Sequence, residues 1–245
     1  MTLVLREDTD GIAVLTLNRP GQLNAMNPEL FVELRAHVDA IAGNIDGVGC
    51  VVLTGAGKNF SAGNDLGAIQ SRERAQSRYF QAETVEALAA LPQPVICAVR
   101  GHCITGGLEL MLGCDLLIAS DTARFRDTHG KFGMVPLWGL SQRLPRRVGL
   151  LKAKEISFTG RAVSGQEAVA IGLANACVPD AEFDAYVMDF ARSIVANSWH
   201  SARGNKLLYQ QSQQLDLAAG LAYERHHSPG VAPDMMERIA NFSRK

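Results

Sequence analysis

Residues 94–120, PVICAVRGHCITGGLELMLGCDLLIAS, place a strand, a glycine turn, a helix and a second strand in one short segment. The apolar run Val95–Val99 follows a proline and is followed by Gly101, a pattern typical of a buried strand. The leucine- and methionine-rich run after the turn predicts a short, mostly buried helix, and residues 115–119 predict a returning strand. The segment therefore predicts an α/β core built around a glycine turn.

The chemistry of this segment is expected at the turn. Gly106 and Gly107 fall where the helix begins, so backbone N–H groups without intrahelical partners point outward there, and no side chain blocks close approach. Such a helix start attracts negative charge, and Glu109 projects beside it three residues later. An acid next to an oxyanion site predicts catalysis. The alternative is structural, because acids favour first helical turns and glycine pairs also mark close packing of a helix on a strand.

Composition limits the classes of function. The chain has 245 residues and 47% hydrophobic content, enough for one large domain or one domain with a helical appendage. Lys plus Arg number 24 against 25 Asp plus Glu, so no overall field draws the protein to nucleic acid or an anionic membrane. No apolar run approaches the length of a membrane span, and the first residues show no targeting pattern. Five cysteines without a CxxC pair or zinc spacing predict a cytoplasmic protein with neither a redox dithiol nor a structural zinc site.

The amino-terminal half repeats the strand-then-glycine theme. Residues 2–6 and 12–17 predict a hairpin with an Asp-Gly turn, and Asn27 followed by Pro28 predicts the start of a helix that ends at Gly43. A buried strand at 50–54 leads into NFSAGNDL at 59–66. We therefore expect two strand ends to present backbone donors side by side.

The remaining pattern becomes increasingly helical. Residues 71–91 predict a partly exposed helix, 123–139 an irregular loop, and 145–158 another helix. Ser164 with Glu167 forms a capping box, and a small strand follows at 176–178. Only helical patterns follow residue 180, with segments beginning near 201, 215 and 233. We expect an α/β core over residues 1–190 and a helical region over 191–245.

The chain contains none of the common signatures of serine hydrolases, zinc proteases, P-loop NTPases or dinucleotide-binding enzymes. Four segments instead resemble the crotonase, or enoyl-CoA hydratase/isomerase, superfamily from the first hairpin to the carboxyl-terminal helices. They are NFSAGNDL (59–66), VRGHCITGGLELMLGCDLLIAS (99–120), FGMVPLWGLSQRLPRRVG (132–149) and AIGLANACVPD (170–180). This superfamily hosts hydratases, isomerases, thioester hydrolases and other acyl-CoA enzymes, so the reaction itself stays open.

The resemblance implies a spiral of repeated ββα units, homotrimers or dimers of trimers built through the carboxyl-terminal helices, and an acyl-CoA thioester as ligand. It implies no cofactor apart from the coenzyme A of the substrate, and no metal. It also implies an oxyanion hole from the backbone N–H groups of Asn64 and Gly106. The residues that match the family's CoA-binding segments are Leu23, Ala25, Met26, Ala62, Asp65 and Leu66, with Arg19 and Lys58 as candidates for the phosphates.

By the same resemblance, Glu109 matches the first of two hydratase glutamates, whereas the second falls on His129. Imidazole titrates near neutrality, so His129 can act as acid or base, and Asp127 could tune it if the loop brings them together. The alternative is that His129 only forms hydrogen bonds within its loop. Trp138, in a loop between Pro136 and Gly139, is expected to line the acyl pocket.

These residues predict enoyl-CoA hydratase chemistry, with Glu109 and His129 as the catalytic residues. The alternatives are Δ3-Δ2 enoyl-CoA isomerisation by Glu109 alone and water attack on a cyclic β-diketone acyl-CoA. A further alternative is a non-catalytic acyl-CoA-binding protein of the same fold. The acid beside the oxyanion hole favours catalysis, because a protein that only binds has no need of it.

Overall fold

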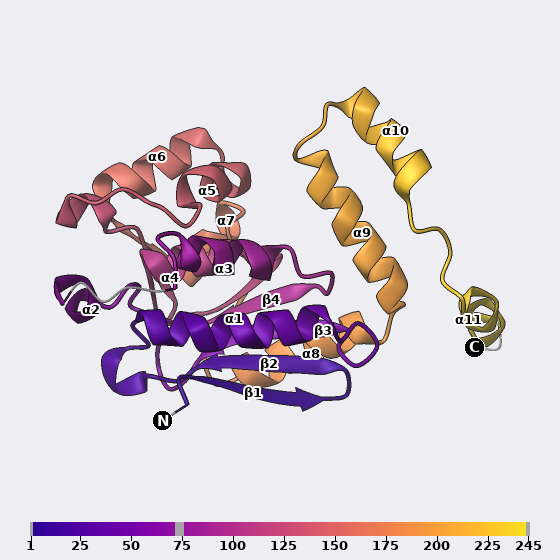
Figure 1. The fold of residues 1–245 in the computed structure, drawn as a ribbon, viewed down its shortest axis with the longest axis horizontal. Coiled ribbons are helices and arrows are strands. Elements are labelled where there is room, and N and C mark those ends of the chain that lie inside the picture. Colours follow the sequence, from indigo (N-terminus) through magenta and orange to yellow (C-terminus); the bar gives the residue numbers. More distant parts are fainter. Residues whose placement is uncertain (1, 72–75, 244–245) are drawn as a thin grey trace.

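A computed structural model describes residues 2–71 and 76–243 (Figure 1). Its centre is a six-stranded sheet in the order β1-β2-β3-β4-β6-β9. β1 pairs with β2 antiparallel, and all the other pairings in this sheet are parallel. The strands are β1 (Val4–Thr9), β2 (Ile12–Leu17), β3 (Cys50–Gly55), β4 (Val95–Val99), β6 (Leu116–Ser120) and β9 (Ala176–Val178).

Alternation along the central strands divides the core into two layers. In β4, Val95, Cys97 and Val99 join the larger hydrophobic cluster, while Ile96 and Ala98 join a second cluster on the opposite face. Successive side chains of a strand point to opposite faces, so a continuous apolar run is expected where both faces are covered. The larger cluster includes residues of α1 (Pro28–Ala42), α3 (Phe80–Ala89) and α4 (Gly106–Leu112). The second is closed by α8 (Phe183–Val195).

A small second sheet makes the chain a spiral. It has the order β5-β7-β8, formed by β5 (His102–Ile104), β7 (Arg124–Arg126) and β8 (Ala162–Ser164). The chain makes two consecutive ββα units. In each unit the first strand joins the large sheet, the second joins the small sheet, and a helix follows. The first unit is β4-β5-α4, and the second is β6-β7 followed by α5 (Leu140–Val148). This is the expected arrangement of ββα units. The sequence pattern did not reveal β5, which lies between the first strand and the glycine pair.

Several local predictions are confirmed. The first hairpin turns at Asp10 and Gly11, both with positive φ. The Asn27 side chain accepts a hydrogen bond from the N–H of Leu30 at 3.1 Å, which caps α1 as predicted. Ser164 accepts one from the N–H of Glu167 at 3.1 Å and begins α7 (Gly165–Ala170). These predictions hold because turn and cap chemistry is local to a few residues.

Two predicted helices have different bounds. Of the helix predicted over 71–91, residues 72–75 lie outside the described part, and the described helix α3 begins only at Phe80, after a separate short helix α2 (Leu66–Gln70) capped by Asp65. The helix predicted over 145–158 is two helices, α5 and α6 (Leu150–Thr159). Gly149 separates them with φ 78°, a left-handed conformation that ends a helix readily in glycine. The segment 123–139, predicted to be an irregular loop, contains β7 and the 3-10 helix η2 (His129–Phe132) between irregular parts. Another 3-10 helix, η1, spans Pro20–Gln22.

The carboxyl-terminal helices leave the body of the protein. α9 (Trp199–Ser212), α10 (Leu217–His227) and α11 (Met235–Phe242) extend to one side, and α11 stands at the end of an extended segment (Figure 1). Residue 190 lies inside α8, whose apolar face covers the sheet, so the chain leaves the body only after Val195. The division at 190 stays a prediction. Within the described residues, no helix is long and apolar enough to cross a membrane.

Candidate active site

Two glycine turns, one after β3 and one before α4, lie pressed against each other. A Cβ at Gly63 would lie 2.6 Å from the carbonyl oxygen of Ile104 and 3.1 Å from the nitrogen of Gly106. A Cβ at Gly106 would lie 3.2 Å from the nitrogen of Asn64. Gly63 also has φ +95°, which L side chains rarely adopt. Only glycine at these positions permits the two backbones to come this close, as the repeated strand-then-glycine pattern predicted.

The turns leave two donors free. Among the described residues, the N–H groups of Asn64 and Gly106 donate to no protein acceptor. Gly106 begins α4, so it has no acceptor one turn earlier in the helix. Two neighbouring N–H groups without partners are suited to a single developing oxyanion.

Glu109 lies in the first turn of α4 and is 2% exposed. Its Oε1 accepts hydrogen bonds from the N–H of Trp138 at 2.8 Å and from the N–H of Leu140 at 3.3 Å. These two donors come from the residues at the start of α5, more than 25 positions along the chain. They fix the carboxylate and leave its other oxygen, Oε2, facing His129. No sequence signal pointed to these backbone donors.

His129 is held between two carboxylates. Its Nδ1 lies 2.8 Å from Oδ1 of Asp127, and its Nε2 lies 3.6 Å from Oε2 of Glu109, a distance suited to an ion pair but too long for a good hydrogen bond. Asp127 also accepts from the backbone N–H of His129 at 3.0 Å and from the Ser157 hydroxyl. All three acidic and basic groups are buried. The loop therefore brings Asp127 and His129 together, and it places them beside Glu109.

The carboxylates shift the titration of the ring. Burial by itself lowers the pKa of His129, but the hydrogen bond to Asp127 and the proximity of Glu109 outweigh it and raise the pKa to about 9. Burial likewise acts to raise the pKa of Asp127, but its hydrogen bonds with His129 lower it below the ordinary value. At neutral pH the site thus holds His129 as an imidazolium.

We expect Asp127→Asn to lower the pKa of His129 from about 9, because the amide keeps the shape of the carboxylate but not its charge. A histidine normally titrates near 6.5, so the stabilisation from this raised pKa is complete below about pH 6.5 and is lost as the pH rises through 9. The variant should therefore be less stable than the wild type at pH 7, by a margin that shrinks above pH 9. NMR titration of the His129 ring and urea unfolding at both pH values measure this.

The matched control is Asp8→Asn, which removes a carboxylate paired with Arg6 on the surface. It should leave the His129 titration unchanged. An unchanged titration in Asp127→Asn itself would contradict the assignment of Asp127 as the partner that holds the ring.

The two predicted CoA-binding segments form one hydrogen-bonded unit. Ala62 N–H donates to the Leu23 carbonyl at 2.9 Å, and Met26 forms an isolated β-bridge with Asn64 through bonds of 2.8 and 3.0 Å to Gly63 and Asp65. Leu23 and Leu66 are exposed at 44% and 48%, and Ala25 and Ala62 are half-buried. Met26 as a whole is fully buried, and its N–H and carbonyl are both occupied by the bonds to Gly63 and Asp65.

Arg19 has a structural role in this unit. Its guanidinium lies 2.8 Å from Oδ2 of Asp65 and also donates to the carbonyl of Ala25, so it joins the two segments. Asp65 is occupied by this ion pair and by the N–H groups at the start of α2. The Arg19 hydrogen bond is the main reason why the pKa of Asp65 lies below its ordinary value. The structure therefore does not support Arg19 as a free phosphate ligand.

An apolar cavity of about 420 Å³ opens beside His129 and Asp127. It lies between η2, α5 and α6, and its apolar lining includes Met134, Leu140 and Leu144. Trp138 is not among its lining residues. Its ring instead packs on Phe31 with centroids 5.0 Å apart, and a Cβ at Gly106 would lie 2.5 Å from it. Trp138 thus packs against Gly106, beside the free N–H groups, and does not line this cavity.

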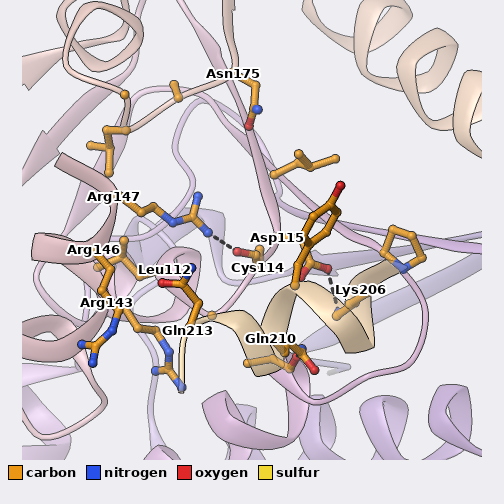
Figure 2. Close-up of a pocket in the computed structure, with 18 of the residues that line it drawn as sticks. Leu112, Cys114, Asp115, Arg143, Arg146, Arg147, Asn175, Lys206, Gln210 and Gln213 are labelled. Carbon is orange, nitrogen blue, oxygen red and sulfur yellow. Dashed lines mark hydrogen bonds and ion pairs between the residues drawn. The ribbon is translucent and has the colours of Figure 1, made fainter. Parts of the chain in front are cut away.

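A larger cavity of about 750 Å³ lies elsewhere, at the carboxyl end of α4 (Figure 2). Figure 2 shows Arg143, Arg146 and Arg147 on one side of it and the ion pair of Asp115 with Lys206 on the other. Glu109 and His129 are not among its lining residues. The free N–H groups and the acid–base residues lie at the opposite end of the same helix, so this cavity is not where the chemistry is placed.

The described residues contain no group of three or more His, Cys, Asp or Glu side chains that could hold a metal ion. The site itself combines two backbone N–H donors, a fixed carboxylate and an imidazolium. This set can stabilise an enolate and move protons to and from the carbons beside a carbonyl.

Comparisons with known proteins identify the family of the chain. Residues 7–231 match the enoyl-CoA hydratase/isomerase family. A probable peroxisomal enoyl-CoA hydratase 1 of Arabidopsis thaliana is 34% identical over 97% of this chain and 91% of its own length. The crystal structure of an enoyl-CoA hydratase from Bacillus anthracis superposes with a TM-score of 0.92 at 32% identity, covering 99% of this chain and 96% of that one. A monofunctional enoyl-CoA isomerase from M. smegmatis gives 0.79 at 32% identity, covering 90% and 99%.

Proposed function

The chain belongs to the enoyl-CoA hydratase/isomerase family, and we propose that it adds water across the double bond of a 2-enoyl-CoA thioester. The observation that carries this proposal is the buried pair of Glu109 and His129, with 3.6 Å between Oε2 and Nε2, beside two free N–H donors. Hydration needs one group to activate water and another to protonate the α-carbon, whereas an isomerisation can be performed by one carboxylate. Two such groups are present here.

The oxyanion hole acts on the thioester carbonyl. The N–H groups of Asn64 and Gly106 bind the carbonyl oxygen, which becomes negative when water adds to the β-carbon and an enolate forms. Donors held in place before the reaction need no reorganisation, and loss of one such donor typically costs about 3 kcal/mol in the barrier. This role follows from backbone geometry and not from the Asn64 side chain.

The two side chains divide the proton transfers. Glu109, fixed in place by two backbone N–H groups, takes a proton from water as the water oxygen bonds to the β-carbon. His129, protonated at neutral pH, gives its Nε2 proton to the α-carbon as the enolate collapses. The double bond is lost and one water is gained. The proton now on Glu109 returns to His129 across the 3.6 Å between Oε2 and Nε2, which restores both groups.

The proposal also assigns the binding sites of the substrate, the assembly of the protein and its location. We assign the CoA moiety to the unit formed by residues 23–26 and 62–66, and the acyl chain to the apolar cavity beside His129. Coenzyme A enters as part of the substrate, and the proposed reaction needs no other cofactor. The projecting helices α9 to α11 expose apolar side chains such as Leu217, Met236 and Phe242, which supports a homotrimer or dimer of trimers. A cytoplasmic location is part of the same proposal.

The test is mass spectrometry of products after incubation with 2-enoyl-, 3-enoyl- and cyclic β-diketone acyl-CoAs in isotopically labelled water. We expect a gain of one water on the 2-enoyl substrate with loss of its double bond. Unchanged mass with solvent hydrogen at carbon would instead favour isomerisation by Glu109 alone. Ring opening of the cyclic substrate would favour hydrolysis, and tight CoA binding without any product would favour a protein that only binds.

A further inference from the structure

The residue before the oxyanion glycine has an unusual backbone. Thr105 has φ 50° and ψ −103° and is 8% exposed. Apart from glycines, positive φ occurs in the described residues only at Asp10, Leu23, Asn24 and Thr105, and of these only Thr105 is β-branched. This conformation is a genuine outlier for a β-branched residue, whereas glycine adopts it without a steric penalty. The threonine side chain must therefore supply something that glycine cannot.

The side chain reaches the turn that carries the imidazole. Thr105 Oγ1 lies 2.5 Å from Oγ1 of Thr128 and accepts the backbone N–H of Thr128 at 3.0 Å. Thr128 is the residue between Asp127 and His129, so both of its neighbours belong to the hydrogen-bonded pair described above. The hydroxyl of Thr105 thus holds the peptide on which the Asp127–His129 pair is built.

The main chain of the same residue reaches the other catalytic group. The carbonyl of Thr105 accepts the N–H of Glu109 at 2.9 Å, and its own N–H donates to the carbonyl of Arg126 at 2.8 Å. We propose that Thr105 is a positioning residue whose hydroxyl sets the placement of His129 against Glu109, a role that rests on the hydration function proposed above. Its unfavourable φ persists because the contacts with Thr128 and Arg126 determine the backbone on both sides.

Three substitutions separate the hydroxyl from the backbone strain. Thr105→Ser keeps the hydroxyl, Thr105→Val keeps the shape and β-branching without it, and Thr105→Gly removes the hydroxyl and the steric penalty together. We expect the serine variant to keep kcat on the preferred enoyl-CoA within about 3-fold. The valine and glycine variants should each lose about 10- to 100-fold in kcat with little change in KM, since misplacement of reacting groups by about 1 Å can cost that much.

The NMR titration of His129 does not require catalytic turnover, so it tests the role of Thr105 independently of the proposed reaction. The His129 ring faces Asp127 and Glu109, and loosening it from them should move its NMR titration midpoint below about 9 in the valine and glycine variants. If the wild type converts no enoyl-CoA, the hydration proposal fails, but this titration still decides the role of Thr105. The glycine variant also covers the case in which the valine variant does not fold.

The matched control is Thr122→Val, which removes a similar hydroxyl pair, because Thr122 Oγ1 lies 2.5 Å from Oγ of Ser120 at the end of β6. It should change neither kcat nor the His129 titration. Wild-type kcat and an unmoved ring titration in both Thr105→Val and Thr105→Gly would overturn the proposal, and the threonine would then be an isolated strained residue without a positioning role.

Discussion

Glu109→Gln should reduce kcat for hydration by about 10²- to 10⁴-fold, the range in which a positioned acid or base contributes to a reaction. The amide keeps an oxygen that can accept from the N–H groups of Trp138 and Leu140, so the start of α5 should stay in place. What is lost is the carboxylate oxygen 3.6 Å from His129 Nε2, and with it the group that takes the proton from water. Steady-state kinetics with the 2-enoyl-CoA identified by mass spectrometry measure the loss.

Glu33→Gln is a suitable control for this experiment. Glu33 Oε2 accepts two backbone N–H groups, from Leu3 and Val4 at 2.7 and 2.9 Å, so it too is a carboxylate held by main-chain donors, but it lies on α1 away from the site. Its activity should be close to wild type. Retention of full activity by Glu109→Gln, with the protein folded and CoA bound, would remove Glu109 from the mechanism.

Lys206→Met should lower the free energy of unfolding by about 1.5–3 kcal/mol, the typical contribution of hydrogen bonds to charged groups, because Lys206 is buried whereas its partner Asp115 is 29% exposed. The Lys206 side chain is 7% exposed, and its Nζ lies 2.7 Å from Oδ2 of Asp115 and 2.9 Å from the carbonyl oxygen of Gln93 (Figure 2). Without it, Asp115 retains only the N–H of Val95 as a donor among the described contacts. Urea unfolding at a fixed protein concentration measures the change.

The position of Lys206 explains why this one side chain matters. Gly204 and Lys206 are the buried residues of α9 in the described chain, and the ion pair is one of the contacts that hold this helix on the body, beside the hydrogen bonds of Arg203 to the Ile45 carbonyl and of Gln210 to the Ala89 carbonyl. The control is Arg192→Met, which breaks an exposed ion pair with Asp189 and should cost no more than about 1 kcal/mol. Equal stability of Lys206→Met and wild type would mean that α9 is held by other contacts. The double variant Lys206→Met with Asp115→Leu should recover part of the loss, since it leaves no unpaired buried charge.

Much of the core could be predicted because its signals are local. The apolar run of β4 and the glycine pair before α4 predict a buried strand and a helix start without any knowledge of the rest of the chain. The caps of α1 and α7 are equally local, since each is one side chain and one N–H group a turn away. The bounds of the helices follow less directly from the sequence. The break at Gly149 depends on how α5 and α6 pack against each other, and the pattern of apolar residues continues across it.

By itself, the sequence determined the α/β core, the two glycine turns and the residue types available for chemistry, because backbone freedom, strand burial and helix capping depend on near neighbours. Only the tertiary structure decided how those residues act together. The position of His129 Nε2 against Glu109 Oε2, the N–H groups of Trp138 and Leu140 on that glutamate, and the contact of Thr105 with Thr128 all join residues 20 or more positions apart. Such contacts arise from the winding of the ββα units, which brings successive turns of the chain side by side, and no local pattern encodes their distances.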